Sequence, residues 1–159
     1  SSTSRGLGDV YKRQALRMRQ HCANAEYVVD FLKKHKEVTK VIYSTEHDKP
    51  IADRAKKYLK GGNGPMIGIE LKGGIEAGKK FIESLKMFYH VANIGDARSL
   101  AIHPASTTHS QLNEKELAAS GVTQSYVRLC IGIEHIDDII EDLDQALNKS
   151  SKGNLKAVS

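Results

Sequence analysis

Apolar and polar residues follow two different periods along this chain, and each period predicts one kind of element. Four short stretches either alternate every second residue or are rich in β-branched residues, which is typical of strands. They are residues 38–43, 66–71, 99–103 and 126–132. Between them, apolar residues recur every three or four positions, which predicts helices with a single apolar stripe. Strands and helices therefore alternate along the chain.

The first helix is expected from about residue 15 to residue 36. Its apolar stripe consists of Met18, Cys22, Ala25, Val29 and Leu32. Asp48 can cap a second helix, which should end at the glycine pair 61–62. The second helix is expected to face the core with Ile51, Ala55, Tyr58 and Leu59. The third helix should do so with Phe81, Ile82, Leu85, Phe88 and Tyr89. The last helix should do so with Ile136, Ile139, Ile140, Leu143 and Leu147. Residues 113–116 fit a capping box and predict one more short helix.

A small sheet with helices packed on one face satisfies this pattern, which makes the fold class α/β, of the α+β type. The other face of the sheet would then be open to water or to another domain. Residues 1–14 are rich in Ser, Gly and Arg and lack an apolar period. We therefore expect them to be an unstructured or foreign leader, followed by one domain at 15–148 and a frayed tail at 149–159.

Composition excludes several classes of protein. The chain has 159 residues, of which 40% are hydrophobic and 27% charged. No apolar run approaches the roughly 20 residues of a membrane span. The net charge is +5, but the lysines are scattered and no aromatic residues interleave with them, so a nucleic-acid partner is not expected. Cys22 and Cys130 are read as free thiols of a cytoplasmic protein.

Arg128 is the residue of chemical interest, because it interrupts an apolar strand. The period of two places Val127, Leu129 and Ile131 toward the helices and Arg128 on the open face of the sheet. A guanidinium there can bind a carboxylate through two parallel hydrogen bonds. The alternative is a salt bridge with one of the nearby acidic residues. The pattern alone favours the salt bridge and leaves carboxylate recognition open.

Other candidate sites are weaker. The glycine-rich residues 61–64 lack the Lys-Ser/Thr of a phosphate-binding loop and fit a helix stop. His103 and His109 have no third ligand at a matching spacing, so loop and supporting roles are favoured over a metal site. Ser99, Ser106 and Ser110 lie near histidines without the context of a hydrolase nucleophile. No complete catalytic apparatus is visible in the sequence.

Several separated motifs nevertheless occur in a recognisable order. They are residues 93–100 (NIGDARSL), 103–109 (HPASTTH) and 127–134 (VRLCIGIE), supported by residues 15–22 (ALRMRQHC) and 72–79 (KGGIEAGK). Together they closely resemble the C-terminal region of the Cys/Met-metabolism family of pyridoxal-phosphate enzymes. The resemblance runs from about residue 15 to residue 147.

The resemblance implies a fold and a site. The fold is the C-terminal small domain of the fold-type-I transferase architecture, with about four strands in a mainly antiparallel sheet. Arg128 matches the family arginine that binds the α-carboxylate of the amino-acid substrate. Asn93 matches a neighbouring position that helps to hold the same carboxylate, and Thr108 matches a residue that supports the arginine.

The resemblance also implies an activity and its partners. The implied reaction replaces the acetyl ester of O-acetyl-L-homoserine with sulfide or a thiol. The cofactor would be pyridoxal 5'-phosphate, held mainly by a large domain that would precede residue 15 and carry the Schiff-base lysine. We therefore expect no catalytic or cofactor-binding residue and no activity in this chain alone, and a homo-tetrameric parent enzyme. The alternatives are a cystathionine γ-synthase or γ-lyase, a methionine γ-lyase, or a non-catalytic ligand-binding or interaction domain.

Overall fold

The computed structural model describes residues 2–107 and 122–151, with side chains from residue 11 onward. The short helix expected at 113–116 lies outside the described residues, as do Thr108 and His109. The helices are α1 (Ser2–Lys34), α2 (Lys49–Tyr58), α3 (Gly74–Ser84) and α5 (Ile136–Ser151), with a 3-10 turn η1 (Pro104–Ser106). The strands are β1 (Val38–Ile42), β2 (Met66–Leu71), β3 (Tyr89–His90), β4 (Leu100–Ile102) and β5 (Tyr126–Cys130).

The strands form one five-stranded sheet in the order β1-β2-β5-β4-β3. The pairs β1–β2, β2–β5 and β4–β5 are antiparallel, and β3 pairs with β4 in parallel. The expected fold class and all four expected strands are therefore confirmed. The additional strand β3 has only two residues, which is too short for a period of two to be visible in the sequence.

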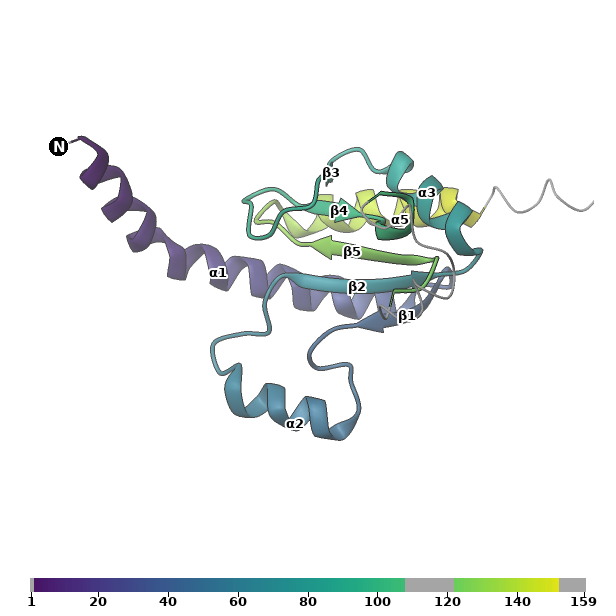
Figure 1. The fold of residues 1–159 in the computed structure, drawn as a ribbon, viewed down its shortest axis with the longest axis horizontal. Helices are drawn as coiled ribbons and strands as arrows, with labels where there is room; N and C mark the ends of the chain where they lie inside the picture. Colours follow the sequence, from purple (N-terminus) through teal and green to yellow (C-terminus); the bar gives the residue numbers. More distant parts are fainter. Residues whose placement is uncertain (1, 108–121, 152–159) are drawn as a thin grey trace, which may run out of the picture.

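The core lies between one face of the sheet and the helices α1, α3 and α5 (Figure 1). Val127, Leu129 and Ile131 are fully buried there, as the period of two predicts. Four residues of the predicted α1 stripe are buried as well: Cys22, Ala25, Val29 and Leu32. The last helix buries Ile139, Leu143 and Leu147. Helices on one face of a small sheet are thus confirmed.

The N-terminal part of α1 differs from the expectation. The helix begins at Ser2 rather than near residue 15, so the backbone of residues 2–14 is helical and not unstructured. Every side chain from residue 11 to residue 20 is exposed, including Met18 at 39%, which was wrongly placed in the stripe. This part of α1 extends away from the rest of the fold (Figure 1). For residues 11–20, local backbone hydrogen bonding therefore contributes more to the helix than burial of side chains. That residues 1–14 are foreign to the domain stays a prediction.

Helix α2 is amphipathic, but it lies apart from the sheet (Figure 1). Of its predicted apolar face only Ala55 is buried. Ile51, Tyr58 and Leu59 are 46%, 68% and 44% exposed, so their expected burial is wrong. Asp48 occupies the N-cap position without a side-chain capping hydrogen bond. An apolar stripe predicts a helix, but it does not predict that another part of the fold will bury that stripe.

Helix α3 ends at Ser84, earlier than its apolar pattern indicates. The cause is Asp142 of α5, which is only 6% exposed. Its carboxylate accepts hydrogen bonds from the backbone N–H groups of Lys86, Met87 and Phe88, at 2.8 to 3.4 Å. In a longer helix these N–H groups would donate to backbone carbonyl oxygens instead. The buried Phe88 therefore lies beyond the end of the helix. Tyr89, expected on the helix face, lies in β3 and is 51% exposed.

Replacing Asp142 with alanine should lower the free energy of unfolding by about 2 to 4 kcal/mol, because several partly buried N–H groups would lose a charged acceptor. Urea denaturation measures this loss. Asp142→Asn retains one acceptor oxygen and should lose less. Glu141→Ala, at an exposed position of the same helix, should change stability by only about 0.5 kcal/mol. Equal losses for Asp142→Ala and Glu141→Ala would contradict the assigned role.

Candidate functional site

Arg128 lies in the central strand β5, on the face of the sheet opposite to the helices. It is in register with Gly68 on β2 and with Ile102 on β4. Gly68 in turn pairs with Ile42 on β1. The guanidinium of Arg128 therefore rises from a row of apolar residues, next to a position that has no side chain. Arg128 itself is partly exposed.

This face is not open along its whole length. Cys130 and Leu100 both point to it, yet each is only 2% exposed. The backbone N–H of Gly95 lies 3.4 Å from the sulfur of Cys130. Burial raises the pKa of the Cys130 thiol, while the Gly95 hydrogen bond and the Arg128 cation act in the opposite direction. The loop at residues 91–98 thus covers one end of the face, and Arg128 lies at the boundary of the covered part.

Asn93 and Arg128, both predicted as site residues, come together in the structure. The contact is made by the backbone, because Nη2 of Arg128 donates to the carbonyl oxygen of Asn93 at 3.4 Å. The side-chain oxygen of Asn93 accepts a hydrogen bond from the N–H of Ile94 at 2.9 Å. Thr108, the third predicted site residue, lies outside the described residues.

The loop that carries Asn93 is fixed from two sides. Arg17 of α1 donates to the carbonyl oxygen of Gly95 at 3.1 Å. On the other side, the N–H of Ile133 donates to the carbonyl oxygen of Ala97 at 2.8 Å. The position of the Asn93 carbonyl is therefore set by both the first helix and the segment that follows β5.

The segment after β5 is held by buried polar side chains. The backbone N–H of Ser99 donates to the carboxylate of Glu134 at 2.6 Å, and the Ser99 hydroxyl does so at 2.9 Å. From α1, His21 donates to the carbonyl oxygen of Ile131 at 2.6 Å. Asn24 donates to the carbonyl oxygens of Gly132 and Glu134 at 3.1 and 3.0 Å. These hydrogen bonds fix the end of the strand that presents Arg128.

No carboxylate among residues 11–107 and 122–151 lies within ion-pair distance of Arg128. On the same face, the nearby acid Glu70 is paired with Lys40 at 3.6 Å. A guanidinium has five N–H donors in a planar fork, and the Asn93 carbonyl accepts from one nitrogen only. Within the described part of the chain, the salt-bridge interpretation of Arg128 therefore has no support. The remaining donors have no hydrogen-bond partner among the described residues.

Tyr126 and Gly68 belong to the same surface, and the sequence did not single them out. A Cβ atom on Gly68 would lie 2.6 Å from Cε2 and 2.8 Å from the hydroxyl oxygen of Tyr126. The tyrosine ring therefore lies over the glycine. The signal available in the sequence was a glycine inside a strand, which often marks the close approach of another group.

His103 has a structural role. It is fully buried. One ring nitrogen lies 2.7 Å from the carbonyl oxygen of Gln124 and the other 2.8 Å from the Ser106 hydroxyl. A carbonyl oxygen only accepts, so Nε2 carries the proton. Both nitrogens are thus used, which is consistent with the favoured supporting role. The described residues contain no group of three side chains arranged to hold a metal ion.

Burial lowers the pKa of the His103 imidazole below 6.5. Below that pH the unfolded chain binds a proton that the folded chain excludes, so the free energy of unfolding should fall as the pH drops through 6.5. Urea titrations at several pH values measure the slope. His103→Gln should flatten it, whereas His47→Gln, at an exposed position, should leave it unchanged. An unchanged slope in His103→Gln would contradict this assignment.

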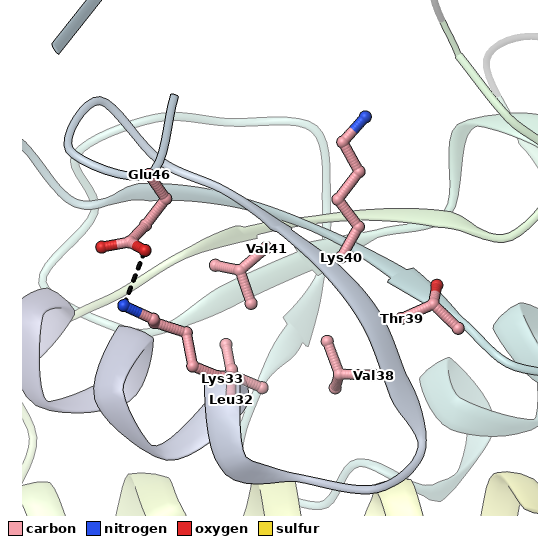
Figure 2. Close-up of a pocket in the computed structure, with 7 residues that line it drawn as sticks. All are labelled: Leu32, Lys33, Val38, Thr39, Lys40, Val41 and Glu46. Carbon is pink, nitrogen blue, oxygen red and sulfur yellow. Dashed lines mark ion pairs between the residues drawn. The ribbon is translucent and has the colours of Figure 1, made fainter. Parts of the chain in front are cut away.

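A separate hollow of about 250 Å³ lies at the edge strand β1, two strands away from Arg128 (Figure 2). Its lining is Leu32, Lys33, Val38, Thr39, Lys40, Val41 and Glu46. Figure 2 shows Lys33 pointing to Glu46, with which it forms an ion pair at 2.7 Å. Glu46 raises the pKa of the Lys33 amine. Lys33 and Glu46 pair with each other, Lys40 pairs with Glu70 outside the hollow, and three of the other four lining residues are aliphatic, so we assign no chemistry to this hollow.

Residues 3–148 match the family described as Cys/Met metabolism PLP-dependent enzyme. The chain belongs to this family. One relative is the O-acetyl-L-homoserine sulfhydrylase of Leptospira meyeri, 50% identical over 133 residues, which are 83% of this chain and 30% of that protein. Another is the L-methionine gamma-lyase of Fusobacterium nucleatum subsp. nucleatum, 46% identical over 84% of this chain and 34% of that protein.

A solved structure agrees with this assignment. The putative O-acetylhomoserine (thiol)-lyase of Campylobacter jejuni has a TM-score of 0.76 and 39% identity, over 86% of this chain and 32% of that chain. The present chain therefore spans about a third of the length of the relatives that it matches. None of the described helices combines the length and the apolar composition that a membrane crossing needs.

Family members depend on pyridoxal phosphate, and the Campylobacter structure holds a pyridoxyl-lysine phosphate group. In the described strands of this chain, the open face has a single lysine, Lys40, whose amine pairs with Glu70. On this face the guanidinium of Arg128 has N–H donors that are not used by any described residue. The described residues therefore fit a single anionic group rather than the whole cofactor.

Proposed function

We propose that this chain forms the substrate-carboxylate site of a pyridoxal-phosphate enzyme of the Cys/Met-metabolism family. One observation carries the proposal. The Arg128 guanidinium stands on the open face of the sheet with no ion-pair partner among the described residues. A partly desolvated cation without a partner is costly, and an amino-acid carboxylate supplies a planar partner of matching geometry.

In this proposal the residues around Arg128 orient the substrate. The Asn93 carbonyl holds one guanidinium nitrogen, which limits rotation of the side chain and directs the other donors away from the sheet. A carboxylate fixed there would set the direction of the substrate Cα relative to the reacting groups, and such orientation is a major part of catalysis. The cofactor supplies the electron-withdrawing chemistry. The supporting role of Thr108 belongs to the same proposal.

For the parent enzyme we propose the γ-replacement of acetate in O-acetyl-L-homoserine by sulfide or a thiol, in methionine or homocysteine synthesis. Support comes from the sulfhydrylases of Leptospira meyeri and Corynebacterium glutamicum, which are 50% and 49% identical. The proposal includes a large domain, a homo-tetrameric assembly and a cytoplasmic location. The methionine gamma-lyase relatives, at 45 to 46% identity, favour a second candidate, a γ-lyase of the same family.

Carboxylate binding is testable on the chain itself. Titration with O-acetyl-L-homoserine should shift the Arg128 Nε–H signal in ¹⁵N-arginine NMR spectra, whereas the corresponding carboxamide should not. Arg128→Gln should weaken binding at least about tenfold, because a charged hydrogen-bonded pair is lost. Arg98→Gln is the matched control, since Arg98 stacks on Tyr89.

Equal shifts with the acid and the amide would overturn the assignment of Arg128. Binding that survives Arg128→Gln would instead support the non-catalytic alternative, a ligand-binding domain that uses another surface.

The reaction type is testable in a chimera. Residues 15–148 would replace the matching third of the Leptospira sulfhydrylase. We expect the chimera to release acetate from O-acetyl-L-homoserine in the presence of sulfide, and Arg128→Ala to lower kcat/KM at least about a hundredfold. Release of methanethiol from methionine, without the acetate reaction, would favour the γ-lyase instead.

A further inference from the structure

The surface beside Arg128 contains a second polar group, the hydroxyl of Tyr126. Tyr126 and Arg128 are two residues apart on β5, so both side chains rise from the same face, about 7 Å apart at their Cα atoms. Tyr126 is in register with Glu70, whereas Arg128 is in register with Gly68. The two side chains therefore start in adjacent rows of the sheet.

The Tyr126 ring extends out of the row of residues that contains Tyr126 and Glu70. Its hydroxyl oxygen would be only 2.8 Å from a Cβ atom on Gly68, so the side chain leans along the sheet and ends over the residue opposite Arg128. Antiparallel partners have Cα atoms about 4.5 to 5.5 Å apart. The phenol hydroxyl is thus brought next to the base of the arginine, over the one position in that row that has no side chain to displace it.

Among the described residues, the hydroxyl has no hydrogen-bond partner that would account for this placement. No hydrogen bond joins it to another described residue, although the side chain is half-buried. Burial raises the pKa of the Tyr126 phenol, and the nearby Arg128 cation acts in the opposite direction. The group therefore stays protonated at neutral pH and remains a hydrogen-bond donor beside a cation.

We infer that Tyr126 is a second binding residue for the substrate carboxylate, donating its O–H to the anion that Arg128 holds, and that Gly68 is a positioning residue that makes room for the ring. The inference rests on the proposed role of Arg128. A guanidinium alone fixes a carboxylate in one plane. A hydroxyl that donates from the side of β2 would fix the rotation of the substrate about that plane.

The test uses the NMR titration of this chain with O-acetyl-L-homoserine. Tyr126→Phe removes only the hydroxyl and should weaken binding about five- to tenfold, the usual effect of one hydrogen bond. Tyr27→Phe, at an exposed position of α1, is the matched control and should bind like the unsubstituted chain. Gly68→Ala displaces the ring and should weaken binding by a similar factor.

A double substitution separates positioning from general damage to the strand. In the Tyr126→Phe background there is no hydroxyl left to misplace, so adding Gly68→Ala should cost no further affinity. An additional loss would mean that the glycine acts on the strand and not through the tyrosine, and would overturn its assigned role.

A readout without ligand checks that the two side chains are neighbours. With ¹³C-labelled tyrosine, the signal of Tyr126 is identified by its absence in Tyr126→Phe. Arg128→Gln should raise the pKa of this phenol, because a neighbouring cation is removed. An unchanged pKa would overturn the inference.

Different results would contradict the proposed role of Arg128 and the inferred role of Tyr126. Arg128-dependent binding with the same affinity in Tyr126→Phe would overturn the role of the tyrosine alone. The absence of any carboxylate-dependent shift in the unsubstituted chain would overturn both.

Discussion

The alternation of side chains along β5 is the constraint on which the rest of the structure depends. This strand is central and pairs on both edges. Val127 and Leu129 face the helices and are fully buried, and each stabilises the fold by about 1.5 to 3 kcal/mol. A shift of register by one residue would expose both and bury Arg128 instead. The core therefore determines where the guanidinium stands, and no contact of the arginine itself is needed to place it.

The same helix that covers the core also fixes the surroundings of the arginine. His21 and Asn24 of α1 hold the backbone after β5, and Ser99 is bound to Glu134 in that segment. His21 and Asn24 are buried and donate to backbone carbonyl oxygens of that segment, so they act as supports of the backbone rather than as ligands. The loop that carries Asn93 is thus built onto the core, although its own residues are largely exposed.

Much of this arrangement can be predicted from sequence, and the failures have clear causes. The strands and the face of Arg128 follow from a period of two, which is a local property. The end of α3 could not be predicted, because it depends on Asp142, more than fifty residues away in sequence. The exposed face of α2 has the same pattern as a buried one. The approach of Tyr126 to Gly68 required the register of two strands, which a single sequence does not contain.

Membership of the family is established for a chain that spans about a third of the length of the relatives that it matches. The contact between Tyr126 and Gly68 has a consequence for how this chain can evolve. Any side chain at position 68 would collide with the ring at position 126. A larger residue at the first position therefore requires the ring at the second position to move or to be replaced by a smaller side chain. Across related sequences, these two positions are expected to covary as a pair.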